Sequence, residues 1–528
     1  MRIYWPDRDP AEPPRDRRDL LTVVGLFVFV IVTRLPALLS PKALDDEQVY
    51  AVVAREMLHG GKPYLDAVER KPPLLFVLYE QILRFGGEHP LAIHVVTVLW
   101  TLATMAVLYL IARRLFSRTA GYWAAFLYAL FTAWADYRSL ALNGELLMNL
   151  PAMAAVAIAF HRGRSRWRPE LLAAGALVTL AFLLKQPSGI VIAALGAYLL
   201  TPDYRRERQL APGHSLLHGA LLTIGFTGAF LIAGAWLWTE GILNEAIYWT
   251  VLDHGVPLGP TTWPFWRGAL IRGSFFLVSA LPLWLGALES VHPRLRARGI
   301  WVGRRAEYWG LLFLLGGSAI GVSASGQFLY HYFLQLVPVL ALLAAPVFAQ
   351  WWEAEAPRGG VLPGRATLTP WLALVAIVFL VVNAIGVAKH DTPGAAASYV
   401  RAHSGANDRL FVWGQGDRFT GFYLDADRRP ASRYIATYPL TGHIFGVWDP
   451  AVNTSNRIVG GAWDSLRVDF GRHPPRYIID TDGIFQPPAY PISRYAFLRD
   501  YLHLNYRQVY RASDGVVYER LETLERRS

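Results

Sequence analysis

Three consecutive acids, Asp45, Asp46 and Glu47, directly follow a long apolar segment, and Lys71 stands before two prolines further along the same polar stretch. Carboxylates can act as general bases, and a lysine can hold a phosphate group. The structural alternative is that acids in the first turn of a helix are favoured by the helix dipole. Unpaired charge beside a membrane, near Arg34 and Lys71, is costly. We therefore favour general-base chemistry next to a bound phosphate.

The residues around these acids predict two short helices. Asp45-x-x-Gln48 has the form of a capping box, so Asp45 is expected to cap a helix that ends before Gly60. A second helix is expected from Pro72-Pro73 to Gly86-Gly87. Both have one apolar side, which predicts helices that lie on the outer membrane surface. With Asp45 committed to capping, Asp46 is the better candidate for the base.

The composition is that of a polytopic helical membrane protein. The 528 residues are 53% hydrophobic and only 17% charged, and apolar runs of roughly 17–24 residues are each long enough to cross a bilayer. The first run, 20–39, is too long for a signal peptide and is read as a retained span. Cysteine is absent, which excludes disulfides and thiolate chemistry. The net charge of +11 fits arginines in cytoplasmic loops, so no nucleic-acid partner is expected.

The distribution of arginine predicts the topology. Arginine-rich connections alternate with connections poor in basic residues, which places the N-terminus in the cytoplasm and the C-terminus outside. About eleven spans are expected, at residues 20–40, 90–112, 119–135, 145–161, 169–185, 187–201, 215–238, 268–288, 308–323, 332–350 and 369–388. The charged loop 41–89 then lies on the outer side of the plasma membrane.

The chain changes character near residue 390. Short strand-like runs, such as 409–413, 477–479 and 516–518, alternate with Gly, Pro and Asp turns. We predict a transmembrane catalytic domain over residues 1–389 and a soluble extracytoplasmic α/β domain over residues 390–528.

The first outer loop carries a motif that resembles a known enzyme family. Its elements are Asp46-Glu47, Tyr50, a glycine shortly before Tyr64, and Lys71-Pro72-Pro73. This pattern is similar to the first periplasmic loop of glycosyltransferase family 39-like enzymes of the GT-C fold, such as protein O-mannosyltransferases and aminoarabinose transferases. The resemblance continues to residues 183–187 (LLKQP) and 330–338 (YHYFLQLVP).

The resemblance implies an inverting glycosyltransferase. It would move a hexosyl or pentosyl group from a polyprenyl-phosphate donor to a glycolipid, glycan or protein acceptor at the outer face of the membrane. Asp46 matches the family's catalytic aspartate, with Glu47 beside it, and Lys71 matches the lysine that faces the phosphate. The additional Asp45 departs from the family pattern and leaves open which aspartate is the base.

Further residues are candidates by position, each with a structural alternative. Arg138, Lys185 and Arg34 are candidates for donor-phosphate contacts, although a snorkelling or turn role is the alternative. Tyr50, Tyr64, Glu145 and Tyr330 are candidates for contacts with substrate or acceptor. The resemblance also implies a divalent cation between a first-loop acid and a later histidine, here His331 or His254, where a buried structural histidine is the alternative.

A transporter or flippase of lipid-linked sugars is the alternative function. Transporters of this kind show inverted repeats and ionisable groups near the middle of the membrane. No repeat is visible, and the charges gather at the outer ends of the expected spans. The enzyme is therefore the preferred interpretation.

Overall fold

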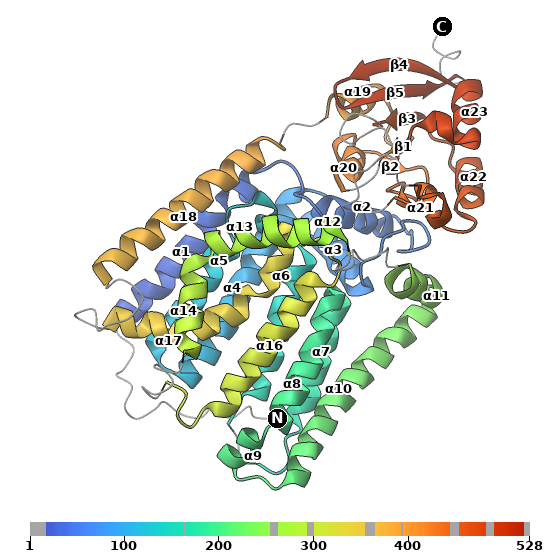
Figure 1. Ribbon diagram of the computed structural model, residues 1–528. Coiled ribbons are helices and arrows are strands. Elements are labelled where there is room, and N and C mark those ends of the chain that lie inside the picture. The colour runs from blue at the N-terminus through green and yellow to red at the C-terminus, as the bar shows by residue number, and fades with distance from the viewer. Residues whose placement is uncertain are drawn as a thin grey trace.

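The computed structural model describes residues 17–162, 165–253, 262–292, 300–353, 365–391, 394–414, 417–443, 453–481 and 490–521. Within these residues the chain forms a bundle of long helices, and a smaller unit with a β-sheet lies over one end of the bundle (Figure 1). The helices of the bundle precede residue 389, and the sheet follows residue 408.

A helix lies at each of the eleven apolar segments expected from the sequence. The bundle contains α1 (Arg17–Leu39), α4 (Pro90–Leu115), α5 (Arg118–Phe131), α6 (Gly144–Ala159), α7 (Glu170–Leu184), α8 (Ile190–Leu200), α10 (Pro212–Thr239), α12 (Trp263–Gly268), α13 (Ser274–Ser279), α14 (Leu281–Val291), α16 (Arg305–Ser323), α17 (Val337–Glu353) and α18 (Arg365–Ala388). Short helices α9 (Pro202–Arg208) and α11 (Leu243–Ile247) stand beside α10.

The described helices differ in their capacity to span a membrane. Four are long and apolar enough by themselves, namely α1, α4, α10 and the segment Leu368–Ala388 of α18. A fifth is added if Trp263–Ser279 and Leu281–Val291, which meet at 82°, count as one broken span. Pro282 lies at this break, where its missing N–H and its ring disrupt a continuous helix. The membrane assignment is thus supported, while the count of eleven spans stays a prediction.

Small residues bring the helices of the bundle into close contact. A Cβ atom on Gly175 of α7 would lie 2.1 Å from the carbonyl oxygen of Leu222, and one on Gly225 of α10 would lie 2.0 Å from the carbonyl oxygen of Leu172. The backbones of α7 and α10 therefore touch in a way that only glycine permits, as is common between membrane helices.

Two helices follow α1 and form the first loop. α3 (Pro73–Gly86) has the expected bounds, but α2 (Glu47–Leu58) begins with Asp46 in the N-cap position. The expected cap at Asp45 is wrong, because this residue has a left-handed backbone with φ of 49°. The carboxylate of Glu47 instead accepts a hydrogen bond from the N–H of Leu44 at 2.7 Å, so Glu47 closes the turn that Asp45 was expected to cap.

The C-terminal unit is a five-stranded mixed sheet with helices. Its strands are β1 (Arg409–Trp413), β2 (Arg429–Pro430), β3 (Tyr477–Asp480), β4 (Tyr506–Ala512) and β5 (Gly515–Arg520), in the order β2-β1-β3-β5-β4. β1 pairs in parallel with β2 and β3, and β5 is antiparallel to β3 and β4. The helices are α19 (Ala395–His403), α20 (Asp417–Asp425), α21 (Tyr438–Thr441), α22 (Ala462–Arg472) and α23 (Ala496–Asn505).

The C-terminal unit covers the first loop. Helix α2 packs against α3 on one side and against α20 on another, and residues 49–54 are all buried. The expected position of α2 at the outer membrane surface stays a prediction, but the helix is covered by protein. Its apolar side chains face protein, because a unit that is distant in the sequence folds over them.

Candidate active site

The two aspartates of the first loop meet a histidine from a distant part of the chain. Asp45 and Asp46 lie at the start of α2, and His331 lies in the 3₁₀ turn η5 (Tyr330–Gln335) that leads into α17. The Nδ1 atom of His331 is 3.2 Å from Oδ2 of Asp45, and its Nε2 atom is 3.7 Å from Oδ2 of Asp46. These three residues are the centre of the site.

This centre has the properties of a divalent-cation site. The ligand atoms of Asp45, Asp46 and His331 all lie within 4.8 Å of one another. Both ring nitrogens of His331 and Oδ2 of Asp45 are buried, and none forms a well-aligned hydrogen bond within the described structure. Buried polar atoms are normally satisfied, and an imidazole with two carboxylates suits zinc, manganese or iron. The expected second candidate, His254, lies outside the described residues.

Asp46 is held in its charged form. The hydroxyl of Tyr50, one helical turn away, donates a hydrogen bond to Oδ2 of Asp46 at 2.7 Å. Burial by itself would raise the pKa of Asp46, but the positive charges of Lys71, His331 and Lys185, with the Tyr50 hydrogen bond, hold this pKa well below its usual range. Asp46 is therefore a carboxylate at neutral pH.

Three cations predicted to contact a phosphate lie around these acids. Nζ of Lys185 is 2.9 Å from Oε1 of Glu145, and Nε of Arg138 is 3.7 Å from Oδ1 of Asp45. Nζ of Lys71 lies 3.5 Å from the carboxylate of Glu69. The positive charge of Lys71 also lowers the pKa of Asp46. The structure thus brings together groups that are separated by more than a hundred residues.

The first residue of α6, Gly144, leaves room for Lys185. A Cβ atom on Gly144 would lie 2.8 Å from Cδ of Lys185 and 3.2 Å from the carbonyl oxygen of Leu184. A glycine at this position therefore allows the lysine chain to pass close to the backbone. The 5% exposed Lys185 and the 1% exposed Glu145 consequently form a buried pair.

Glu47 has its carboxylate directed into the protein scaffold. Its Oε1 accepts a hydrogen bond from the N–H of Leu142 at 2.5 Å, and its Oε2 accepts the N–H of Leu44 and lies 3.1 Å from Nε2 of His94. Glu47 and His94 are both fully buried. These contacts join the start of α2 to α4 and to the loop before α6, which favours a scaffolding role over the predicted catalytic one.

The remaining predicted residues occupy different places. The hydroxyl of Tyr64 donates to the carbonyl oxygen of Lys71 at 2.8 Å, so Tyr64 holds the backbone of the lysine. The ring of Tyr330 lies beneath the guanidinium of Arg138, 5.4 Å from its centroid. The 1% exposed Arg34 donates to the hydroxyl of Thr132 at 2.9 Å inside the bundle. Its hydrogen-bond partners are outside the charged cluster, so neither a phosphate contact nor snorkelling is supported for Arg34.

Sequence reasoning missed the neighbours of Lys71. Arg70 pairs with Asp253 at 3.0 Å, and its guanidinium lies 4.1 Å from the ring centroid of Tyr438. The side-chain amide of Gln186 donates to the carbonyl oxygen of Arg70 at 3.0 Å. Arg70 was visible next to the Lys-Pro-Pro motif, but nothing local in the sequence indicated its partner Tyr438.

Known proteins resemble the chain in sequence and in fold. Residues 70–237 match the sequence family described as dolichyl-phosphate-mannose-protein mannosyltransferase. No curated protein matches the chain. The crystal structure of ArnT from Cupriavidus metallidurans bound to undecaprenyl phosphate has a TM-score of 0.59 and 16% identity, over 94% of this chain and 97% of that one. The same protein in the apo state has a TM-score of 0.56 and 16% identity, over 96% and 98% of the two chains.

A weaker likeness is to the archaeal oligosaccharyltransferase AglB from Archaeoglobus fulgidus in complex with an inhibitory peptide and a dolichol-phosphate. Its TM-score is 0.49 and its identity 13%, over 88% of this chain and 69% of that one. The likeness to ArnT shows the fold, and the family match covers the Lys-Pro-Pro motif and the helices up to α10. The resemblance to GT-C membrane glycosyltransferases of the family 39 type is therefore confirmed.

Proposed function

We propose that this membrane protein is an inverting glycosyltransferase that moves a sugar from a polyprenyl-phosphate donor to an acceptor hydroxyl or amine. The observation that carries the proposal is the buried Asp46 carboxylate, which accepts a hydrogen bond from Tyr50 at 2.7 Å, lies 3.7 Å from His331 and is within reach of the charges of Lys71 and Lys185. A carboxylate next to a pair of cations provides a proton acceptor and a binding site for a phosphate leaving group in one place.

The cations suit the phosphate of a lipid-linked donor. Lys71, Lys185 and Arg138 surround the acids at the end of the bundle where the first loop and η5 meet. When the glycosidic bond breaks, negative charge grows on the departing phosphate, and cations already in position stabilise that charge most in the transition state. The undecaprenyl phosphate bound to the similarly folded ArnT supports a polyprenyl phosphate as the lipid carrier.

Asp46 is the proposed general base. It would accept the proton of the acceptor while the acceptor oxygen or nitrogen attacks the anomeric carbon from the side opposite the phosphate, which inverts that carbon. In the free protein the cations make Asp46 a weak base. A bound donor phosphate would neutralise part of the charge of Lys71 and Lys185, and the pKa of Asp46 would then rise towards the range of an effective base.

A divalent cation fits the centre of the site. Asp45 and His331, with Asp46 beside them, would hold it. Such an ion would supply positive charge next to the donor phosphate. The role of the protein would be to keep the imidazole and the carboxylates in their present arrangement.

The position of the charges favours an enzyme over a transporter. Asp45 and Asp46 lie at the start of α2, and Lys71 lies just before α3, in the loop between two candidate spans. A transporter for lipid-linked sugars would place its ionisable groups on interrupted helices near the middle of the membrane. We assign the site to the outer face of the plasma membrane, with residues 390–528 on the same side, because the arginine distribution predicts this topology.

Mass spectrometry of the cell envelope tests the proposal. Glycans, glycolipids and glycoproteins would be compared between cells with the gene, cells without it, and cells that carry the Asp46→Asn variant. Loss of one sugar from one class of acceptor in both altered strains would support the proposal and name the sugar and the acceptor. Identical profiles in all three strains would contradict it.

A further inference from the structure

The C-terminal unit holds the far end of helix α2 through a buried ion pair. Nε and Nη2 of Arg429 donate to the two carboxylate oxygens of Glu56 at 2.8 and 2.7 Å. Glu56 is only 5% exposed, and Arg409 lies 3.6 Å from the same carboxylate. Two-pronged arginine–carboxylate contacts of this kind fix orientation as well as distance.

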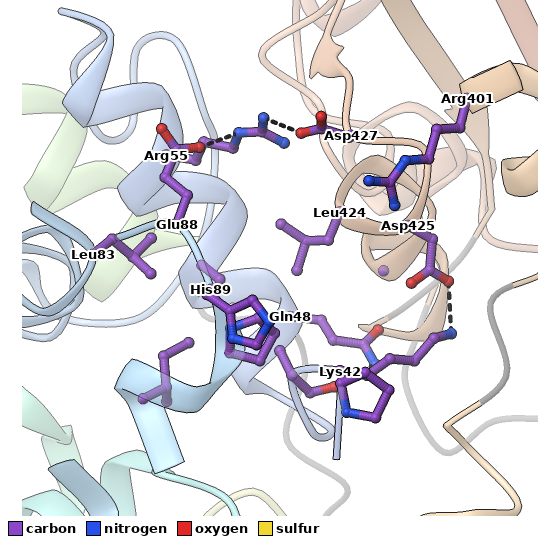
Figure 2. A pocket seen from close by; sticks show the side chains of 16 residues that line it. Lys42, Gln48, Arg55, Leu83, Glu88, His89, Arg401, Leu424, Asp425 and Asp427 are labelled. Carbon is purple, nitrogen blue, oxygen red and sulfur yellow. Dashed lines mark hydrogen bonds and ion pairs between the residues drawn. The ribbon is translucent and has the colours of Figure 1, made fainter. Parts of the chain in front are cut away.

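Two more ion pairs connect the first loop to the C-terminal end of α20, and their residues line a cavity. Lys42 pairs with Asp425 at 2.7 Å, and Arg55 pairs with Asp427 (Figure 2). Near these contacts lies a cavity with a volume of about 450 Å³, which is lined by residues of α2, α19 and α20 among others. Next to the cavity α2 and α20 touch directly, because a Cβ atom on Gly421 of α20 would lie 2.1 Å from Oε1 of Gln48. The ion pairs thus add charged contacts to an interface that also has close packing.

The side of α2 that faces this cavity is opposite to the side that faces the site. Gln48, Ala51 and Arg55 line the cavity, and they repeat at the helical spacing of three and four residues. Asp46 and Tyr50, also four residues apart, point to His331 and the cations. If α2 moves as a rigid body, a shift of the side that contacts the C-terminal unit also shifts the Asp46 carboxylate on the opposite side.

The C-terminal unit also holds the segment before Lys71. The N–H of Val68 donates to the carbonyl oxygen of Arg433 at 2.8 Å, and Arg433 is itself fixed by Asp469 at 2.8 Å. Two residues further on, the ring of Tyr438 lies against the guanidinium of Arg70. The segment that these contacts hold ends at Arg70, the residue directly before Lys71.

We propose that the C-terminal unit is a positioning element of the catalytic site, with Arg429 and Tyr438 as its positioning residues. Arg429 holds the helix that carries Asp46, and Tyr438 holds the residue next to Lys71. Together they set the spacing between the proposed base and the proposed phosphate ligand. This inference rests on the proposed function, because the spacing matters only if both groups act on one substrate.

The expected consequence for catalysis follows from a displacement of the reacting groups. A displacement of reacting groups by about 1 Å can lower a rate by roughly 10²-fold. When Arg429 is replaced, the buried Glu56 carboxylate keeps Arg409 at 3.6 Å as a cationic partner, so the unit stays attached while α2 loses its two-pronged contact. We therefore expect Arg429→Met and Tyr438→Leu to lower kcat by about tenfold or more, with little change in the KM for the donor.

The first arm of the test needs no substrate. Hydrogen–deuterium exchange on the full chain in nanodiscs would compare Arg429→Met and Tyr438→Leu with two controls. Tyr438→Phe keeps the ring over Arg70, and Arg499→Met removes an exposed arginine whose partner is the neighbouring Asp500. Faster exchange of the amides in residues 47–58 for Arg429→Met and in residues 64–71 for Tyr438→Leu, with both controls like wild type, would support the proposal.

The second arm measures transfer with a labelled polyprenyl-phosphate sugar. The expected result is the fall in kcat for the two positioning variants and wild-type rates for the two controls. Unchanged exchange in both variants would overturn the proposal whatever the reaction is. Faster exchange with unchanged kcat would also overturn it, because the contacts would then only tether the unit. If wild type shows no transfer but the variants exchange faster, the proposed function and the catalytic part of this inference are refuted. The contacts of Arg429 and Tyr438 would then be shown to hold α2 and the segment before Lys71, without a role in catalysis.

Discussion

Replacement of Glu47 by glutamine tests the assignment of this residue to the scaffold. The change conserves shape but removes the charge and converts one carboxylate oxygen into an amide NH₂. Oε1 faces the N–H of Leu142, while Oε2 faces the N–H of Leu44 and Nε2 of His94. In either orientation the new NH₂ group therefore meets at least one donor that needs an acceptor.

The size of the effect follows from these contacts. A hydrogen bond to a charged group contributes about 1.5–3 kcal/mol, and an unsatisfied buried donor adds a penalty of its own. With one or two bonds lost in a fully buried place, we expect Glu47→Gln to lower the free energy of unfolding by about 3–5 kcal/mol. This is a large part of the stability of an ordinary domain.

Thermal unfolding followed by tryptophan fluorescence is a suitable assay, because the chain contains 19 tryptophans. Glu47→Gln should lower Tm by roughly 3–5 °C, whereas the exposed control Asp464→Asn should stay close to wild type. A Tm equal to that of wild type, together with loss of transfer, would refute the scaffold argument and restore the catalytic role predicted from the sequence.

Three further outcomes are expected. Lys71→Met should lower kcat by about 10²-fold, measured with a labelled lipid-linked sugar; a rise in donor KM alone would make the lysine only a binding contact. His331→Ala and Asp45→Asn should each weaken Zn²⁺ binding at least about tenfold in calorimetry; equal affinities would place the ion elsewhere. Burial and the charge of Arg70 lower the pKa of His443 to about 4 from 6.5. The unfolded chain then binds the extra proton between pH 6.5 and 4, so stability should fall by about 3 kcal/mol as the pH drops through this window. A pH-dependent melt of His443→Gln should lack that part of the loss, and an unchanged profile would contradict the assignment.

The features that could be predicted depend on residues that are close together in the sequence. Apolar runs of sufficient length located helices at all eleven expected segments, because burial in lipid or protein requires such runs. The prolines and glycines at its ends predicted α3 with its observed bounds. Strand β1 was also predicted in full, since it is a short apolar run between turns. The motif predicted that Asp46 and Lys71 would act together, and the structure places the charge of Lys71 beside Asp46.

The features that were missed depend on contacts between distant parts of the chain. The cap at Asp45 was wrong, because the left-handed backbone of this residue is not indicated by its neighbours. The contacts of Glu47 with Leu142 and His94 could not be read from neighbouring residues either. The burial of α2 depends on α20, which is more than 350 residues away. Strand β4 was not expected because it is polar and only partly buried, and it is held by hydrogen bonds to β5.

The most direct test of the central claim is the transfer rate of Asp46→Asn. The purified wild type and variant would be assayed in nanodiscs with a labelled polyprenyl-phosphate sugar and the acceptor found in the cell envelope, with donor binding and Tm measured on the same samples. A positioned general base contributes about 10²–10⁴ in rate, so the variant should lose at least about 10²-fold in kcat while it still folds and binds the donor. An Asp46→Asn variant that transfers sugar at the wild-type rate would contradict the claim that Asp46 removes the proton of the acceptor.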